Sequence, residues 1–315
     1  MTAVKVRPVA RVLDPGPFTT IQDFGRFGFR RFGVPVSGAL DLWSLSFANR
    51  QLGNNPDSPA LEVFHGPMVI AALEDVVVGY SGESSEVTVD GKASEENPLR
   101  FRNGSTLRLE PGMDSAMVYL AFAGGLVVDY VMGSASTYTR ARFGGISGRT
   151  LQKGDLLYSA GGGVQTATGR RVTTLNAPER HRVIMGPHAD LFPPESLDNF
   201  FKTEYRISFD SDRMGYRLGG PVLNGFREWG SVLTFPVFPG MVQVTPDGLP
   251  IVLMADCQTT GGYPVIAIVL PPDLCALAQK PPGAAVLFEE VTDEESPRII
   301  ESFSLSAGLG PKARH

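Results

Sequence analysis

Short apolar runs separated by turn residues recur along the whole chain. Alternating apolar and polar positions predict half-buried strands at 85–91 (SEVTVDG) and 105–110 (STLRLE). Continuous apolar runs of strand length predict more deeply buried strands at 68–73, 75–80, 116–122, 181–186, 205–210, 241–246, 250–255 and 284–291. The pattern indicates a protein built mostly from short strands.

Helical periodicity is rare by comparison. The stretch 37–53 has an apolar face, with Ser37 as the expected N-cap and Gly53 as a natural C-terminal stop. Two shorter helices are predicted at 271–283, where prolines stand at both ends, and at 195–201. The predicted fold class is therefore mainly β, with a few short helices.

Composition supports this picture and excludes several classes of protein. The 36 glycines and 25 prolines among 315 residues are spread between the apolar runs, as many turns require. A net charge of −5 argues against a dedicated nucleic-acid-binding protein, and no apolar stretch is long enough to cross a membrane. The N-terminal stretch lacks the apolar core of a signal peptide, so we expect a cytoplasmic protein.

A polar stretch rich in Gly, Thr and Arg, 160–181, divides the chain. We place a first subdomain at 1–165, a linker at 166–180 and a second subdomain at 181–315. The same order of signals occurs on both sides: a strand, a Pro-Gly or Asp-Gly turn, a strand and a Gly-Gly pair. Duplication and a shared turn vocabulary of β proteins both explain this likeness.

The usual catalytic and metal-binding motifs are missing. No phosphate-binding G-x-x-x-x-G-K-[ST] loop and no Gly-x-Ser-x-Gly nucleophile turn is present. The four histidines are not spaced as metal ligands, and the two cysteines, Cys257 and Cys275, form no Cys-x-x-Cys pair. We expect no metal site.

Three stretches combine polar side chains with glycines. The strand predicted at 250–255 runs directly into Asp256, Gln258, Thr259, Thr260, Gly261, Gly262 and Tyr263. A second stretch, 208–221, contains Asp212 and Arg213, which could fix a turn, while Arg213 could instead bind an anion in bidentate fashion. The third, 15–41, contains Thr20, Gln22, Asp23, Arg26, Ser37 and Asp41. Its structural interpretation is a capped turn with Asp23 and Arg26 paired.

Five segments in order resemble the allophanate hydrolase subunit 2/KipA family. They are TTIQDFGRFGFRRFGVPVSGALD, FANRQLGNNPDSPALEV, FGGISGRTLQKGDLL, SFDSDRMGYRLGGPVL and QVTPDGLPIVLMADCQTTGGYPVIAIV. This family includes one of the subunits of prokaryotic 5-oxoprolinase and is related to the carboxyltransferase domain of urea carboxylase. The resemblance implies two cyclophilin-like β-barrel subdomains, a KipI-like partner subunit, and an active site where the two proteins meet.

The function that the resemblance implies is a subunit of an ATP-dependent 5-oxoprolinase, an enzyme that opens a lactam. ATP would be a co-substrate of the complex, with a LamB-like third subunit beside the KipI-like one. Two alternatives remain open: a carboxyltransferase-type component working with carboxybiotin on urea or a related amide, and a non-catalytic regulator of a KipI-type kinase inhibitor.

Residue chemistry suggests roles at such a site. The predicted catalytic residues are Asp256, Gln258 and Tyr263. A buried structural carboxylate is an equal alternative for Asp256. The predicted substrate-binding residues are Asp212, Arg213, Thr259, Thr260, Gly261 and Gly262. The polar residues of the stretch 15–41 form a second candidate cluster.

Overall fold

The first half of the chain folds into two antiparallel sheets. The computed structural model describes residues 6–161, 178–224 and 232–309. The six-stranded sheet runs β11 (Leu156–Ser159), β1 (Arg7–Asp14), β4 (Met68–Ala72), β9 (Thr106–Pro111), β6 (Ser85–Val89) and β7 (Lys92–Ala93). The five-stranded sheet runs β2 (Phe18–Gln22), β3 (Ala60–Phe64), β10 (Met117–Phe122), β5 (Val76–Ser81) and β8 (Leu99–Phe101).

These two sheets enclose one apolar core. Five fully buried side chains illustrate it. The six-stranded sheet contributes Val12, Ile70 and Leu107, and the five-stranded sheet contributes Leu61 and Leu120. Strand β9 buries every second residue, as its sequence alternation predicts. Burial of these apolar faces stabilises the half by roughly 1.5–3 kcal/mol for each large side chain.

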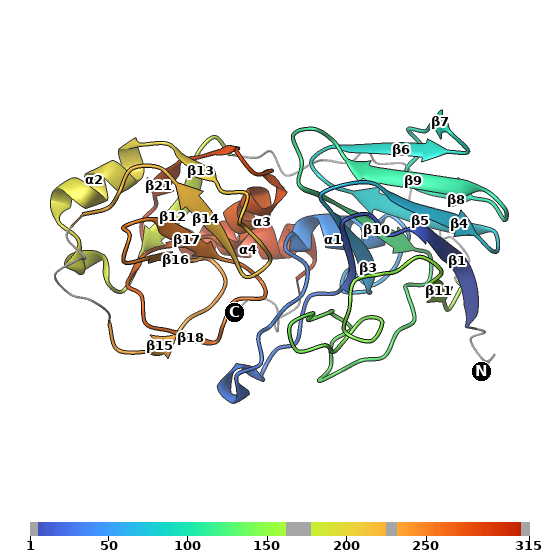
Figure 1. Cartoon of the computed structure of the whole chain (residues 1–315), viewed down its shortest axis with the longest axis horizontal. Helices are drawn as coiled ribbons and strands as arrows, with labels where there is room; N and C mark the ends of the chain where they lie inside the picture. The colour runs from blue at the N-terminus through green and yellow to red at the C-terminus, as the bar shows by residue number, and fades with distance from the viewer. Residues whose placement is uncertain (1–5, 162–177, 225–231, 310–315) are drawn as a thin grey trace.

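The second half contains an eight-stranded sheet and a small ribbon. The sheet runs β20 (Ala285–Val286), β13 (Tyr205–Ile207), β14 (Gly215–Gly219), β17 (Pro250–Leu253), β16 (Met241–Val244), β19 (Val265–Val269), β12 (His181–Met185) and β21 (Phe288–Glu290). The ribbon pairs β15 (Phe235–Pro236) with β18 (Thr260–Gly261). No sheet of the described chain mixes strands from the two halves, which lie side by side in Figure 1.

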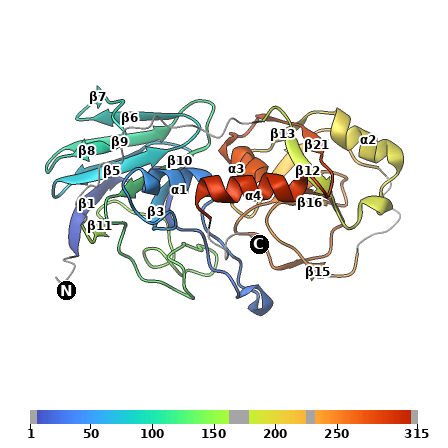
Figure 2. The ribbon, with the colours of Figure 1, turned by 180° about the vertical axis from the view of Figure 1, so that it is seen from behind.

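Helices fill the junction between the halves. Helix α1 (Leu42–Arg50) contacts α3 (Pro271–Gln279) and α4 (Ser296–Ala307), and the view from behind shows α4 lying across the junction (Figure 2). The rings of Trp43 and Phe303 pack with their centroids 6.2 Å apart. Helix α2 (Pro194–Lys202) lies at the far end of the second half, and short 3-10 turns occur at η1 (Arg30–Phe32) and η2 (Ala189–Leu191). The second apolar core is therefore shared across the junction.

The mainly β fold class is confirmed, with strands close to the predicted positions and four α-helices in the described chain. The predicted helix start at Ser37 is wrong. Ser37 has a left-handed φ of 56°, and the N-cap is Asp41, whose carboxylate accepts a hydrogen bond from the Ser44 amide at 3.0 Å. None of the described helices has the length and apolar character that a membrane span needs.

The sheets change between Ser159 and His181. The predicted linker, 166–180, lies outside the described residues up to position 177. The predicted subdomain boundaries therefore stay predictions.

Candidate functional site

Arg213 lies buried in the junction with all of its nitrogens bonded. Nε and Nη2 donate to the two oxygens of Asp256 at 2.9 and 3.1 Å, and Nη2 also donates to the Gly38 carbonyl at 2.6 Å. Nη1 donates to a carboxylate oxygen of Glu62, on β3 of the first half. The arginine of the second half is thus held by carboxylates from both halves.

The charges of this group compensate one another. Burial alone lowers the pKa of Arg213, but the carboxylates of Asp256 and Glu62 outweigh that effect and raise the pKa above its ordinary value. Ser37 donates to Asp256 Oδ1 at 2.6 Å, and the Tyr119 hydroxyl donates to Glu62 Oε2 at 2.6 Å. Arg213 is therefore a fully bonded cation that joins the halves.

A second set of bonds continues this contact. The Tyr119 hydroxyl accepts from the Asp41 amide at 2.9 Å, and the Asp41 carboxylate accepts from Gln279 Nε2 at 2.7 Å. Gln279 ends α3, and its Oε1 accepts from Ser115 at 2.7 Å. Both predicted residues Ser37 and Asp41 thus bond across the junction.

Asp23 organises the loop that follows β2. Its Oδ1 accepts from the Gly25 amide at 2.8 Å and the Ser134 hydroxyl at 2.6 Å, and its Oδ2 accepts from the Ala135 amide at 2.6 Å. The Ser136 hydroxyl also donates to Oδ1. The pairing of Asp23 with Arg26 that the sequence suggested is wrong: no ion pair joins these two described residues, because serines and backbone amides occupy the carboxylate.

Arg26 is fully buried yet only partly bonded. Its Nη2 donates to the Ser136 carbonyl, while Nε and Nη1 have no hydrogen-bond partner among the described residues. Desolvation lowers the pKa of Arg26, and the nearby carboxylates of Asp23 and Asp256 offset that effect only in part. A guanidinium in this state is unusual in a folded protein.

Gln22, four residues before Arg26 in the chain, is also only partly bonded. Its Nε2 donates to Thr20 Oγ1 at 2.9 Å and to the Thr137 carbonyl at 3.3 Å, whereas its Oε1 has no partner within the described chain. Gln22 and Arg26 therefore bond to consecutive carbonyls of one segment, those of Thr137 and Ser136.

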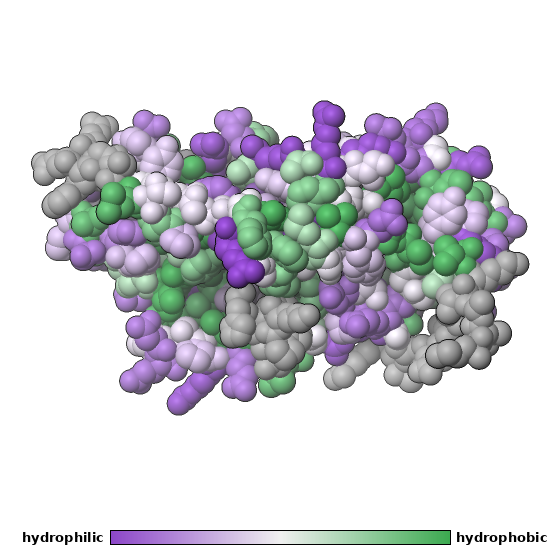
Figure 3. Space-filling model, turned by 90° about the horizontal axis from the view of Figure 1, so that it is seen from below, coloured by the Kyte–Doolittle hydropathy of each residue, from purple (hydrophilic) through white to green (hydrophobic). Residues whose placement is uncertain are grey.

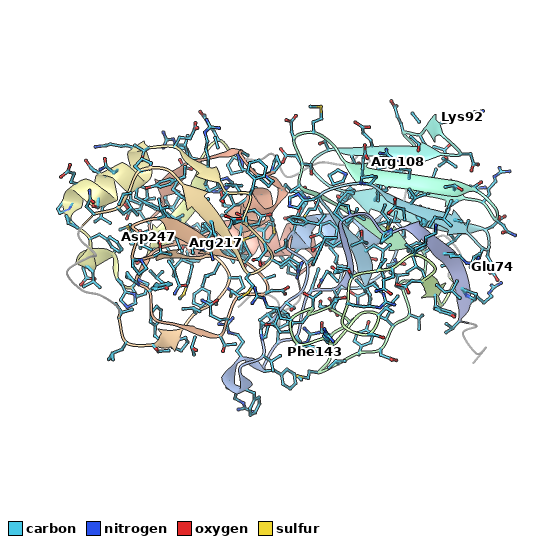
Figure 4. All side chains as sticks on the ribbon, in the orientation of Figure 1. Glu74, Lys92, Arg108, Phe143, Arg217 and Asp247 are labelled. Carbon is cyan, nitrogen blue, oxygen red and sulfur yellow. The ribbon has the colours of Figure 1, made fainter. Side chains whose placement is uncertain are left out.

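Glycines let that segment approach. A Cβ on Gly144 would collide with the Ser136 carbonyl oxygen, and a Cβ on Gly145 would collide with Thr137 Oγ1. Their φ angles of 74° and 51° are left-handed. The next residue back, Phe143, places its ring over the Arg26 guanidinium with 4.6 Å between the ring centroid and Cζ. Figure 4 shows Phe143 at the lower edge, between the two halves.

Beyond Asp256, the side chains of the polar stretch after β17 make no hydrogen bond to Arg213 or Arg26 in the described chain. Gln258 Nε2 donates to Gln243 Oε1 at 3.3 Å, the Thr259 carbonyl accepts from the Val237 amide, and Thr260 is exposed in β18. The ring of Tyr263 is 41% exposed.

The two glycines of this stretch have ordinary backbone angles. A Cβ on Gly261 would lie 2.7 Å from Gln243 Nε2, so close packing explains this glycine, whereas a Cβ on Gly262 would make only ordinary contacts. Of the predicted residues in this stretch, only Asp256 bonds to Arg213.

Asp212 fixes a turn, one of the two roles expected for it. Its Oδ1 accepts from the Met214 amide at 2.8 Å, and its Oδ2 lies 3.7 Å from Arg140 on the 138–143 hairpin. Asp256 already accepts bonds on both oxygens, which favours the structural alternative for this residue. The catalytic and substrate-binding roles stay predictions.

Sequence reasoning missed several partners in this junction. Glu62 interrupts the buried run of β3, and a charged residue inside an apolar strand is a signal that could have found it. No such signal marks the other missed residues, because their partners lie 57 to 238 residues away in the chain. These residues are Ser134, Ser136, Tyr119 and Gln279.

The described residues hold no group of three or more His, Cys, Asp or Glu side chains placed to bind a metal ion. Cys257 and Cys275 are buried free thiols. Seen from below, apolar side chains gather near the middle of the molecule beside strongly hydrophilic ones (Figure 3).

Comparisons with known proteins agree on one family. The chain is 37% identical over 287 residues to a 5-oxoprolinase subunit of Escherichia coli, covering 91% of this chain and 92% of that one. It resembles the crystal structure of TTHA0988 with a TM-score of 0.79 and 34% identity, over 90% of this chain but 56% of that one. It resembles the K. lactis urea amidolyase with a TM-score of 0.84 and 27% identity, over 96% of this chain and 20% of that one.

The family model described as carboxyltransferase domain, subdomain A and B, matches residues 32–290. That span takes in Asp41, Glu62, Arg213, Asp256 and Gln279, the residues that join the two halves. The chain belongs to the carboxyltransferase domain A and B family.

Proposed function

We propose that this chain is a subunit of an ATP-dependent 5-oxoprolinase, which converts 5-oxo-L-proline, ATP and water to L-glutamate, ADP and phosphate. The observation that carries the proposal is the near end-to-end match with the E. coli 5-oxoprolinase subunit, at 37% identity. The K. lactis urea amidolyase is matched over only 20% of its length.

Two polar features of the chain support this proposal chemically. Opening an unstrained lactam requires a small polar molecule to be held still while charge develops on its carbonyl oxygen. The cluster around Gln22 and Arg26 supplies an amide oxygen and two guanidinium nitrogens that lack partners in the described part of the chain. The exposed Thr260 and Tyr263 lie on the polar stretch after β17 and are available to a substrate or a partner subunit.

Two further parts of the proposal concern the complex. We assign ATP binding to another subunit, because this chain has no phosphate-binding loop motif. We also propose that activity requires a KipI-like subunit, and a LamB-like third subunit, with the active site at the contact between proteins.

Reconstitution tests the proposed function. The chain is purified with its KipI-like and LamB-like subunits, and glutamate release from 5-oxo-L-proline is measured with ATP present. We expect turnover from the three proteins together and none when this chain is left out. Turnover that persists without this chain would refute the proposal.

The second candidate is a carboxyltransferase component that acts on urea or a related amide. The family description and the TM-score of 0.84 to the K. lactis urea amidolyase favour it. The sequence has no biotin-acceptor Met-Lys-Met, so carboxybiotin would have to come from a separate carrier protein. Transfer of labelled carboxylate from such a carrier to urea, without ATP-dependent glutamate release, would favour this function.

A further inference from the structure

Arg26 is a buried charge that has no counter-ion in contact among the described residues. It is fully buried, it bonds only to the Ser136 carbonyl, and Nε and Nη1 have no partner among the described residues. Asp23 does not neutralise it by contact, because Ser134, Ser136 and two backbone amides already occupy that carboxylate. Folding a cation into such a place is costly unless a group that is absent from the free chain completes it.

The partnerless atoms of Arg26 and Gln22, two side chains that bond to the consecutive carbonyls of Ser136 and Thr137, define the missing group. Arg26 offers N–H donors and a positive charge, and the Gln22 Oε1 offers an acceptor. A carboxylate satisfies the guanidinium, and an N–H group satisfies the amide oxygen. The matching ligand therefore carries a carboxylate next to an amide N–H.

One half-buried aromatic ring lies over the Arg26 guanidinium. The Phe143 ring lies over the guanidinium at 4.6 Å and is itself only half-buried. It closes a small hairpin in which the Tyr138 amide donates to the Phe143 carbonyl at 2.9 Å, and residues 140–142 at the tip are exposed. Phe143 is therefore the half-buried side chain of this hairpin that lies against the guanidinium.

The hairpin tip and η1 both carry exposed arginines. Arg140 and Arg142 are exposed at the hairpin tip, where Arg140 lies 3.7 Å from Asp212, and Arg31 is exposed in η1. The chain as a whole has a net charge of −5, so exposed cations close to Phe143 in the sequence are a local feature that favours small anions.

We propose that Gln22 and Arg26 form the site that recognises a small carboxylate bearing an adjacent amide N–H, and that Phe143 covers this site in the free chain. The inference rests on the proposed function in one respect: in 5-oxo-L-proline the carboxylate and the lactam N–H are attached to the same carbon. Arg26 binds the carboxylate, Gln22 accepts from the lactam N–H, and the ring carbonyl remains free for chemistry.

The test measures ligand binding and turnover in the reconstituted complex. Dissociation constants are measured for 5-oxo-L-proline and for 2-pyrrolidone, which has the lactam but no carboxylate, with wild type, Arg26→Met, Arg26→Lys and Phe143→Ala. Arg100→Met, an exposed arginine on β8, is the matched control.

We expect Arg26→Met to weaken 5-oxo-L-proline binding roughly tenfold or more, since hydrogen bonds to a charged group are lost. Its effect on 2-pyrrolidone should stay within about twofold, and Arg26→Lys should recover part of the loss. Phe143→Ala should tighten binding or speed association several-fold by removing the cover. Arg100→Met should behave as wild type.

Unchanged 5-oxo-L-proline affinity in Arg26→Met would overturn the inference, and so would an equal loss for 2-pyrrolidone. Phe143→Ala keeps the test decisive if Arg26→Met fails to fold, because weaker binding in that variant contradicts a cover. If the wild-type complex makes glutamate but its KM is unchanged in Arg26→Met, the inference fails and the proposed function stands. If no glutamate forms but a cyclic amide carboxylate binds in an Arg26-dependent way, the proposed function fails and the inference stands.

Discussion

Two buried arginines lie near the same carboxylate and are treated in opposite ways. Arg213 has every nitrogen bonded, with Asp256 and Glu62 as its counter-ions, and these two raise its pKa. Arg26 has one carbonyl partner and an aromatic ring, and its pKa is lowered by burial. The hydrogen bonds and ion pairs of Arg213 are complete within the described chain, whereas those of Arg26 are not.

Burial alone does not distinguish these two arginines. Both side chains are nearly inaccessible, at 5% and 0% exposure, so exposure does not separate them. Their hydrogen bonds do separate them. A buried cation whose N–H donors are all bonded stabilises the fold, whereas one with unbonded N–H donors is available to bind another group. We expect substitution of Arg213 to act on stability and substitution of Arg26 to act on function.

The largest expected effect is on Arg213. Arg213→Met leaves the Asp256 and Glu62 carboxylates buried without a cation, so the free energy of unfolding should fall by about 3–5 kcal/mol. Urea denaturation at pH 7 measures it. Arg217→Met, on β14 four residues after Arg213 but exposed (Figure 4), should change stability by less than about 0.5 kcal/mol. Equal effects in the two variants would contradict the role assigned to Arg213.

The support of Arg26 can be tested separately. A Cβ on Gly144 collides with the Ser136 carbonyl, which accepts the one hydrogen bond of Arg26, while Gly91 has a similar φ of 77° and open space around it. Gly91→Ala should cost about 1 kcal/mol from its left-handed backbone, and Gly144→Ala about 1–3 kcal/mol more. Thermal and urea unfolding of both variants measures the gap, and equal costs would show that the segment shifts freely.

The buried His181 ring likewise has unbonded nitrogens within the described chain, but unlike Arg26 it can lose its charge. Both ring nitrogens lack partners among the described residues, and burial lowers the pKa of His181 to about 4, so the ring stays neutral. Its folded pKa lies below the unfolded value of about 6.5, so its contribution is complete above pH 6.5 and is lost as the pH falls toward 4.

Relative to His181→Leu, the wild type should therefore lose about 2–3 kcal/mol between pH 7 and pH 4.5. Comparing the two proteins at each pH removes the contribution of Asp57, whose pKa is raised by burial to about 6 and whose effect has the opposite sign. Stability curves that run parallel with pH would mean that His181 is solvated or paired.

The smallest expected effect is on the stability of Arg26 variants. Arg26→Met loses one hydrogen bond and the contact with Phe143, but it also removes a desolvated cation, so stability should stay within about 1 kcal/mol of wild type. Urea denaturation beside Arg213→Met gives the comparison directly. A loss as large as that of Arg213→Met would remove the distinction between the two arginines.

Local patterns predicted the elements well and the contacts between halves poorly. Strand β9 and helix α3 follow from alternation and from flanking prolines, because these signals act over a few residues. The helix start failed at Ser37, since its left-handed φ and its bond to Asp256 depend on a segment 219 residues away.

The candidate site shows the same contrast between local patterns and long-range contacts. The sequence singled out Arg213 and Asp256, and the structure brings them together, but it could not show that Glu62 is the third member. The stretch 15–41 was noticed for its polar residues, whereas the idle atoms of Gln22 and Arg26 become visible only once every partner is placed. Long-range bonding is a property of the fold and leaves no local pattern.

The return of α4 to the junction has a consequence for synthesis of the chain. Domains generally fold as they leave the ribosome, N-terminal first. Trp43 and Glu62 are made long before their partners Phe303 and Arg213, so the first half emerges with an apolar helix face and a carboxylate still uncovered. The growing chain must be kept from aggregating until α4 is made, and products truncated before α4 should be prime targets for chaperones and proteases.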